Sequence, residues 1–307
     1  MATPNLQRCT RMAKVALCTS AIGTPGGISI SPVHGDIGFT RSPRVFQMGP
    51  AWSDACLIGT NALDGVILSF RGTLPFDFGD LASIIDWLNS ARATLVHGPG
   101  GGGRVHAGFS QSLDHLWACG IAEEVRAQVK TSGYRPLHIT GHSKGGALAL
   151  LATARLIEEG LPVSSITTFG APRAGDQEFV NSLTSHHSGP AIWRFEHRDD
   201  LIPHLPPGPL PARMIREIAQ SIDRGATGGP FDHTSAGTLE FINWDDELET
   251  DSIWLEIRRL GSLAQMLIHG RLNEMVECHC LESAYAAKIS RLADRAVRGP
   301  STPRVRQ

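Results

Sequence analysis

The chain has 307 residues, 41% of them hydrophobic and 19% charged, and a formal net charge of -2. This length and composition suit a large buried core and exclude a disordered or fibrous protein. The near-neutral charge offers no basic surface for phosphates, so we do not expect nucleic acid as a partner. No apolar run approaches the roughly 18 residues of a membrane-spanning helix, so we expect no transmembrane segment.

The N-terminal stretch 1–27 is expected to form a helix rather than a secretion signal. Its apolar part, Val15 to Cys18, is too short and too interrupted for the hydrophobic region of a signal peptide. The six cysteines form no C-x-x-C pair, which favours buried, reduced thiols over a disulfide framework. We therefore expect a cytoplasmic protein, while export without a signal peptide stays open.

The next part of the chain alternates short apolar runs with a longer amphipathic segment. The runs 54–60 and 66–70 are joined by residues 61–65, which predicts a hairpin. A long helix is predicted over 109–130, because apolar residues recur there at three- and four-residue spacing.

The central region has the order strand, helix, strand. Strands are predicted at 137–140, 165–169 and 192–195, with a helix over 144–159 that a glycine and a proline end. This order requires crossover connections and parallel pairing. The fold class is therefore α/β, with a mostly parallel sheet flanked by helices.

Several segments are predicted to be irregular. The glycine-rich run 98–103 is expected to be a flexible connector, since no helix start follows that could aim amides at a phosphate. Segments 203–211 and 223–230 are rich in proline or glycine and predict surface loops. Residues 291–307 are predicted to be a flexible basic tail, which leaves 1–290 as a single domain.

A candidate nucleophile lies at residues 141–145, which read Gly-His-Ser-Lys-Gly between a strand and an Ala- and Leu-rich helix. This is the context of a G-x-S-x-G nucleophile elbow. Small residues on either side let the strand and the helix pass closely, and the following helix start supplies free amides. A serine that only capped the helix would not need both glycines, so we predict Ser143 as the nucleophile.

A serine nucleophile requires a base and an orienting acid, and in this fold both follow it in the chain. Asp199 and Asp200 follow the strand at 192–195, and spacing alone does not choose between them. His279 is preferred as the base on chain order, with His233 as the runner-up. The Cys-His-Cys run around His279 is a poor metal site, because adjacent ligands cannot easily wrap one ion. We expect neither a metal nor a cofactor.

Seven blocks of the chain carry a family resemblance. They are 67–73 (ILSFRGT), 86–88 (DWL), 105–109 (VHAGF), 141–146 (GHSKGG), 168–176 (TFGAPRAGD), 200–207 (DLIPHLPP) and 279–285 (HCLESAY). In this order they resemble the class-three lipase family, the fungal-lipase-like branch of the α/β hydrolases. The resemblance implies an α/β-hydrolase fold.

The resemblance also assigns roles to single residues. It selects Asp200 over Asp199 as the acid, and it selects His279 as the base. It implies that Thr73 serves the oxyanion through its N–H and hydroxyl. The backbone N–H of Lys144, the residue after the nucleophile, is the second expected oxyanion donor.

Three features extend or depart from the family pattern. A lid is implied at about 74–92, although its apolar residues would equally suit a core helix. The insert at about 208–276 matches no block with certainty. Lys144 stands where the family usually has leucine, and its side chain is expected at the pocket rim, where it would favour anionic substrates, pair with a carboxylate or simply be solvated.

The implied function is that of a serine-dependent carboxylic-ester hydrolase. Its substrates would be acylglycerols or similar lipid esters, and a lid would place the reaction at a lipid–water interface. A phospholipase or an acyltransferase with the same triad is the alternative. An inactive binding module with a hydrolase fold is a third hypothesis, against which the complete set of candidate residues argues.

Overall fold

The computed structural model describes residues 3–24, 37–48, 53–73, 94–184, 189–208 and 232–298. Its described residues form an eight-stranded sheet in the order β1-β2-β3-β6-β7-β9-β11-β12. The strands β3, β6, β7, β9 and β11 pair in parallel, while β1, β2 and β12 pair antiparallel at the two edges. Their bounds are Arg44–Met48 for β1, Asp54–Asn61 for β2, Gly65–Phe70 for β3, Leu137–His142 for β6, Ser165–Phe169 for β7, Ala191–His197 for β9, Thr238–Ile242 for β11 and Leu248–Thr250 for β12. The expected hairpin and parallel strands are confirmed.

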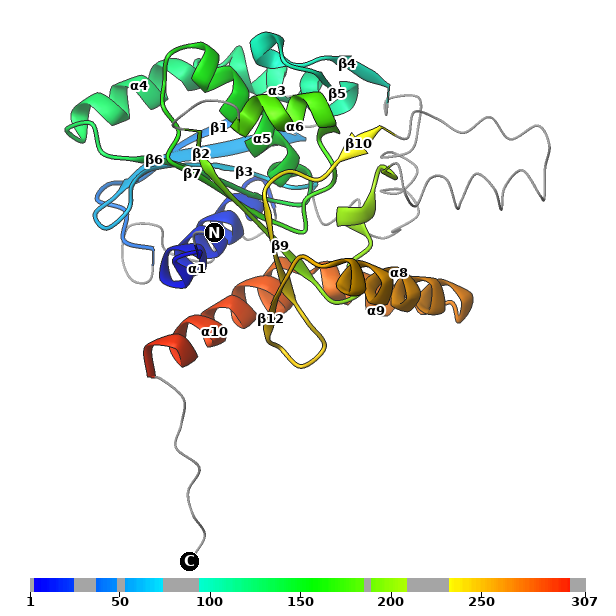
Figure 1. Ribbon diagram of the computed structural model, residues 1–307. Coiled ribbons are helices and arrows are strands. Elements are labelled where there is room, and N and C mark those ends of the chain that lie inside the picture. Colours follow the sequence, from blue (N-terminus) through cyan, green and yellow to red (C-terminus); the bar gives the residue numbers. More distant parts are fainter. Residues whose placement is uncertain are drawn as a thin grey trace, which may run out of the picture.

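Helices cover both faces of this sheet. Figure 1 shows α3 to α6 on one face and α1 with α10 on the other. The helices are α1 Leu6–Ser20, α3 Ala107–Trp117, α4 Ile121–Thr131, α5 Lys144–Glu158, α6 Gln177–Thr184, α8 Ile253–Ile268, α9 Leu272–His279 and α10 Ala287–Arg298, with short turns η5 Ile202–His204 and η6 Leu281–Ala286. The arrangement is that of an α/β hydrolase, as expected.

The core lies on both faces because side chains alternate along a buried strand. On β2, Cys56 and Ile58 join the cluster formed with α3 and α5, whereas Ala55 and Leu57 join the cluster formed with α1. Continuous apolar runs therefore mark strands that are covered on both sides.

The helix predicted over 109–130 is wrong as a single element. It is two helices, α3 and α4, separated at Ala118 to Gly120, and Gly120 has a left-handed φ of 86°. Leu116 before the break and Ile121 after it are both fully buried in the same core cluster. The apolar spacing therefore continues across the break and does not reveal it.

A second, four-stranded antiparallel sheet has the order β10-β8-β5-β4. Its strands are β10 His233–Thr234, β8 Gly175–Asp176, β5 Arg104–His106 and β4 Leu95–His97. The Gly98 N–H donates to the Gly103 carbonyl at 3.1 Å, and a 3-10 turn η4, Pro99–Gly101, lies between them. The expected flexible connector is thus an ordered hairpin turn.

The proline-rich segment after β9 is buried, so the predicted surface loop is wrong over residues 203–206. Pro203, His204 and Leu205 are buried, and the Arg173 guanidinium donates to the carbonyls of His204 at 2.7 Å and Pro206 at 3.1 Å. These hydrogen bonds satisfy backbone groups that water would otherwise have to solvate.

The remaining predictions fall partly outside the described residues. The N-terminal helix is α1, and the expected tail contains residues 291–298 of α10, while 299–307 lie outside. The insert contributes β10 to β12, α8 and part of α9, and its residues 209–231 lie outside, as does the expected lid at 74–92. All six cysteines are free thiols; Cys9, Cys18 and Cys56 are buried, whereas Cys280 is exposed. No helix of the described ranges has the length and apolar character needed to cross a bilayer.

Candidate active site

Ser143 lies on the turn between β6 and α5, with φ 54° and ψ -131°. This left-handed conformation is costly for a residue with a side chain and persists only where the surroundings impose it. Here the Ser143 N–H donates to the Phe169 carbonyl at 2.9 Å, and the Gly146 N–H donates to the Ser143 carbonyl at 2.9 Å. The turn is therefore held from both sides.

Two glycines make this turn possible. A Cβ at Gly141 would lie 2.2 Å from the Gly145 carbonyl oxygen, and a Cβ at Gly145 would lie 2.2 Å from the Phe70 carbonyl oxygen. Real atoms do not approach so closely, so only glycine lets β3, β6 and the first turn of α5 pack together. The G-x-S-x-G spacing thus has the steric basis that the sequence predicts.

Asp200 and His279 form a buried pair. Asp200 follows β9, and His279 is the last residue of α9; their side chains are 1% and 5% exposed. The His279 Nδ1–H donates to Asp200 Oδ2 at 2.8 Å, and the Ile202 N–H donates to Asp200 Oδ1 at 3.0 Å. With the proton on Nδ1, the Nε2 atom of His279 carries the lone pair that a base requires.

Tyr285 is a third donor to this carboxylate, and its role was not predicted from the sequence, where it appears only as the last residue of the final family block. Its hydroxyl donates to Asp200 Oδ2 at 2.5 Å from a π-helical turn, η6. Burial, and then the Asp200 carboxylate, raise the pKa of Tyr285 well above its ordinary value. The hydroxyl therefore keeps the proton that it donates.

Gly170 forms the floor under this group. It follows β7 with φ 54°, and a Cβ there would lie 2.8 Å from Asp200 Oδ2 and 3.0 Å from both His279 Nδ1 and the Tyr285 hydroxyl. Any side chain at this position would push the acid and the base apart. The block at 168–176 pointed to this region without identifying the glycine.

His142 connects the turn of Ser143 to His279. The two imidazole rings have centroids 4.5 Å apart, and the His142 Nε2–H donates to the His279 backbone carbonyl at 2.8 Å. Burial, and then the nearby His279, hold the pKa of His142 well below its ordinary value. A neutral His142, the residue before Ser143, thus contacts both the ring and the backbone of His279.

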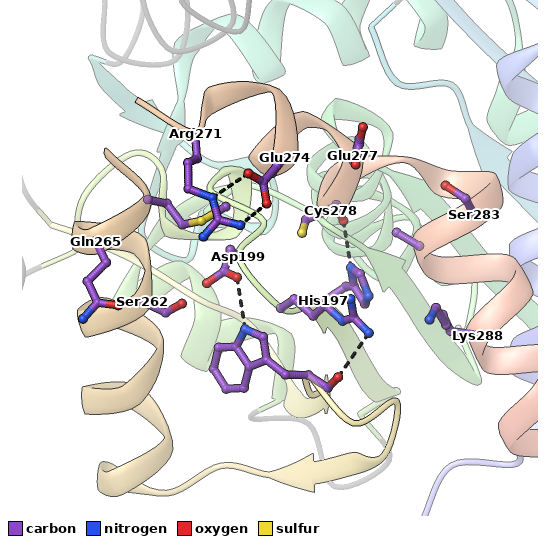
Figure 2. A pocket seen from close by; sticks show the side chains of 14 residues that line it. His197, Asp199, Ser262, Gln265, Arg271, Glu274, Glu277, Cys278, Ser283 and Lys288 are labelled. Atoms are coloured by element: carbon purple, nitrogen blue, oxygen red, sulfur yellow. Dashed lines mark hydrogen bonds and ion pairs between the residues drawn. The ribbon is translucent and has the colours of Figure 1, made fainter. Parts of the chain in front are cut away.

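Asp199, the other candidate acid, points elsewhere. The Trp244 Nε1–H donates to Asp199 Oδ2 at 3.0 Å. Figure 2 shows Asp199 lining a pocket together with His197 and Cys278. The two neighbouring side chains therefore make different contacts, and Asp200 is the one that lies beside His279.

His233, the runner-up base, lies in the small sheet. It is fully buried, and as part of β10 it lies opposite Asp176 of β8 in the antiparallel pairing. Its ring centroid is 6.1 Å from that of His106. The structure places it against another histidine rather than against Asp200.

The two expected oxyanion donors lie at neighbouring backbone segments. Thr73 follows Gly72 in the segment after β3, and a Cβ at Gly72 would lie 3.0 Å from the His142 carbonyl oxygen and 3.3 Å from Ser143 Cβ. This segment therefore runs beside the serine. Lys144 begins α5, where the first backbone N–H groups have no acceptor within the helix itself.

The Lys144 side chain pairs with a carboxylate. Its Nζ lies 2.6 Å from Asp54 Oδ1, and the side chain is 11% exposed. Of the three expectations for this residue, the ion pair is confirmed and the solvated lysine is wrong.

Elsewhere, the His, Cys, Asp and Glu side chains of the described residues form no group of three that could hold a metal ion.

Comparison with known proteins gives consistent similarities. Residues 67–209 match the sequence profile of the family described as Lipase (class 3). The chain is 33% identical over 152 residues to secreted mono- and diacylglycerol lipase 1 of Fusarium solani, covering 48% of this chain and 41% of the relative. It is 32% identical over 196 residues to the chloroplastic phospholipase A(1) DAD1 of Arabidopsis thaliana, covering 53% and 42%. The chain thus spans less than half the length of these curated relatives.

Solved structures show the same fold at low sequence identity. The native lipase propeptide complex of Rhizomucor miehei has a TM-score of 0.57 at 21% identity, covering 81% of this chain and 72% of that one. Lipase II of Rhizopus niveus has a TM-score of 0.58 at 24% identity, covering 79% and 82%.

The expected cytoplasmic location is contradicted. The Fusarium relative is a secreted lipase, and a secreted mono- and diacylglycerol lipase of Penicillium cyclopium is 31% identical over 144 residues. These relatives point to an extracellular location. The thiol argument failed because Cys9 and Cys18 are buried in the core, where they are shielded from oxidants in any compartment.

Residues 67–209, which include Ser143 and Asp200, thus match the profile of the class 3 lipase family, and the related sequences and the shared fold agree with the geometry around Ser143.

Proposed function

We propose that this chain is a serine-dependent carboxylic-ester hydrolase whose substrates are acylglycerols or similar lipid esters. The observation that carries the proposal is the buried hydrogen bond of 2.8 Å between Asp200 and His279. It joins a base to an orienting carboxylate, and the ring of His142, the residue before Ser143, lies against that base. A base that is oriented by a buried carboxylate and lies beside the residue before a serine supports acyl transfer through that serine.

The reaction follows from these positions. His279 Nε2 takes the proton of the Ser143 hydroxyl as its oxygen attacks the ester carbonyl carbon. The carbon–oxygen bond to the alcohol then breaks, and His279 returns the proton to the leaving alcohol. Water, deprotonated by the same nitrogen, attacks the acyl-enzyme and releases the fatty acid and Ser143. Asp200 keeps the imidazole in the required tautomer throughout.

Negative charge on the carbonyl oxygen must be met by fixed donors. The backbone N–H of Lys144 and the N–H and hydroxyl of Thr73 are the proposed donors. Their support is the close passage of the segment at Gly72 beside Ser143 and the position of Lys144 at the start of α5, directly after Ser143. The lid at about 74–92, which would open at a lipid surface, stays a prediction.

Replacing the nucleophile tests the chemistry. We expect Ser143→Ala to lower kcat on p-nitrophenyl esters on the order of a millionfold, because the members of a triad act as a unit. A panel of rising acyl-chain length, with and without emulsified triglyceride, measures chain preference and interfacial behaviour together. Ser132→Ala, at the end of α4, is the matched control and should keep full activity. Hydrolysis by Ser143→Ala at the wild-type rate would refute the proposal.

The base is tested by comparing two histidine variants. His279→Ala should lose activity to a degree comparable with Ser143→Ala, whereas His233→Ala should keep kcat if it still folds. Thermal unfolding of both variants separates loss of chemistry from loss of structure. The assignment is wrong if only His233→Ala is inactive while both remain folded.

A phospholipase is the second candidate, favoured by the similarity to a phospholipase A(1) over 196 residues. It would use the same residues and differ in head-group selection. Incubation with phosphatidylcholine and with diacylglycerol, followed by separation of free fatty acid from transferred acyl chains, distinguishes the hydrolases from an acyltransferase. A fluorophosphonate probe that leaves Ser143 unlabelled would instead indicate an inactive binding module.

A further inference from the structure

The side chain of Lys144 has no role in the proposed reaction, yet it is tightly placed. Its ammonium lies 2.6 Å from Asp54 Oδ1, and the two side chains are 11% and 1% exposed. The other oxygen of Asp54 lies 3.0 Å from His115 Nδ1 on α3. A carboxylate this deeply buried is costly to desolvate unless cations and donors compensate it. The pair is therefore a specific internal contact and not a surface ion pair.

The start of β2 also contacts the segment after β3 that contains Thr73. Asp54 is the first residue of β2, and the carbonyl of its neighbour Ala55 accepts from the Arg71 N–H at 2.9 Å. One end of one strand thus contacts both backbone segments that carry the proposed oxyanion donors: Ala55 holds the segment of Thr73, and Asp54 holds Lys144.

Backbone hydrogen bonds of Ser143 and Gly146 hold the turn before α5, and the Lys144 side chain adds an anchor to the first turn of the helix. Gly145 and Gly146 follow Lys144, and the helix has no side-chain hydrogen bond at its N-cap, Ser143. Glycines widen the range of backbone conformations open to this turn. A long side chain anchored at both ends, by its Cα in the helix and by its ammonium at Asp54, restricts that range.

From these contacts we infer that Asp54 and the Lys144 side chain are positioning residues for the oxyanion site. The ion pair holds the first turn of α5 so that the Lys144 N–H points at the developing oxyanion. This inference rests on the proposed hydrolase function and adds to it. It assigns the ammonium to Asp54 and not to the substrate, so Lys144 does not select anionic esters.

A double-mutant cycle tests the pair. Lys144→Met and Asp54→Asn should each lower kcat by about tenfold. This loss is smaller than the loss on the order of a hundredfold that follows when an oxyanion donor is removed outright. KM should change less than about twofold, because the donor acts mainly in the transition state. The double variant should lose about as much as either single variant, because both changes break the same contact.

The control is another ion pair of the same helix. Arg155 on α5 pairs with Asp114 on α3 at 2.5 Å, and Asp114 is 57% exposed. Arg155→Met should leave kcat unchanged, because it removes an ion pair of α5 away from the turn. Active sites are counted by fluorophosphonate labelling to completion, so kcat refers to folded enzyme even if Lys144→Met is destabilised. Asp54→Asn tests the same ion pair from the other partner, because it removes the buried carboxylate charge itself.

Three results would overturn the inference. The first is a wild-type kcat in both single variants, and the second is a double variant whose losses multiply to about a hundredfold. The third is an unchanged kcat with an altered preference between anionic and neutral esters, which would make Lys144 a substrate-selecting residue. If the wild-type chain itself neither hydrolyses esters nor takes up the probe, the proposed function fails as well, so the two failures are distinguishable.

Discussion

Gly170→Ala should separate the acid from the base without altering either residue. The new Cβ would lie 2.8 Å from Asp200 Oδ2 and 3.0 Å from His279 Nδ1, whereas ordinary contacts begin at 3.4 Å. The neighbours must therefore retreat by about half an ångström each, and the hydrogen bond of 2.8 Å between them lengthens or turns. A misplacement of about 1 Å costs on the order of a hundredfold in rate. We expect kcat to fall by about 10- to 100-fold.

The same substitution also carries a backbone cost. Gly170 has a φ of 54°, and this left-handed conformation costs an alanine about 1–2 kcal/mol. Such a loss lowers Tm by roughly 2–8 °C in a domain of this size. Kinetics on a p-nitrophenyl ester and thermal unfolding of the same preparation measure the two effects separately.

Gly160→Ala is the matched control. Gly160 follows the C-terminus of α5 with a φ of 78°, and a Cβ there would meet nothing within 4 Å. It should show the same order of Tm loss as Gly170→Ala and a wild-type kcat. The reasoning is refuted if Gly170→Ala keeps kcat within about twofold of wild type, or if Gly160→Ala loses as much activity.

Three further changes probe the same site and the core. Thr73→Ala should lower kcat by about 100- to 1,000-fold if Thr73 serves the oxyanion, and an unchanged rate in the ester assay would remove it from the site. Tyr285→Phe removes a donor to Asp200; since hydrogen bonds to charged groups contribute about 1.5–3 kcal/mol, we expect lower thermal stability and a kcat reduced about tenfold, and no change in either would contradict the orienting role. Burial lowers the pKa of His138 and of His197 from 6.5 to about 4. As the pH falls, these two histidines bind protons in the unfolded chain at a higher pH than in the folded protein. Their contribution to the free energy of unfolding is therefore present in full above pH 6.5 and falls by about 3 kcal/mol for each histidine as the pH drops toward about 4. Urea unfolding at pH 7 and pH 4.5 measures this loss, which His138→Gln should reduce; a flat profile would show that the buried histidines do not control acid stability.

Short sequence patterns were sufficient to predict a structural feature where its physical cause lies within a few residues of the pattern. The turn at Ser143 is predictable because the steric conflict that it avoids lies within residues 141–145 and the strand beside them. The strands β2, β3, β6, β7 and β9 are predictable for the same reason, since burial on both faces requires continuous apolar runs. The break at Gly120 is not, because the apolar face continues through it and a glycine alone does not say whether a helix ends.

By itself the sequence determined the α/β order, the elbow with Ser143, and the candidates Asp200 and His279 once the family blocks were aligned. Only the tertiary structure decided that Asp199 faces Trp244, that Gly170 supports the acid and the base, and that Lys144 pairs with Asp54. The reason is distance along the chain: Asp200 and His279 are 79 residues apart, and Lys144 and Asp54 are 90 residues apart. No local spacing encodes such contacts, because they depend on which strands become neighbours in the sheet and on which side each loop residue faces.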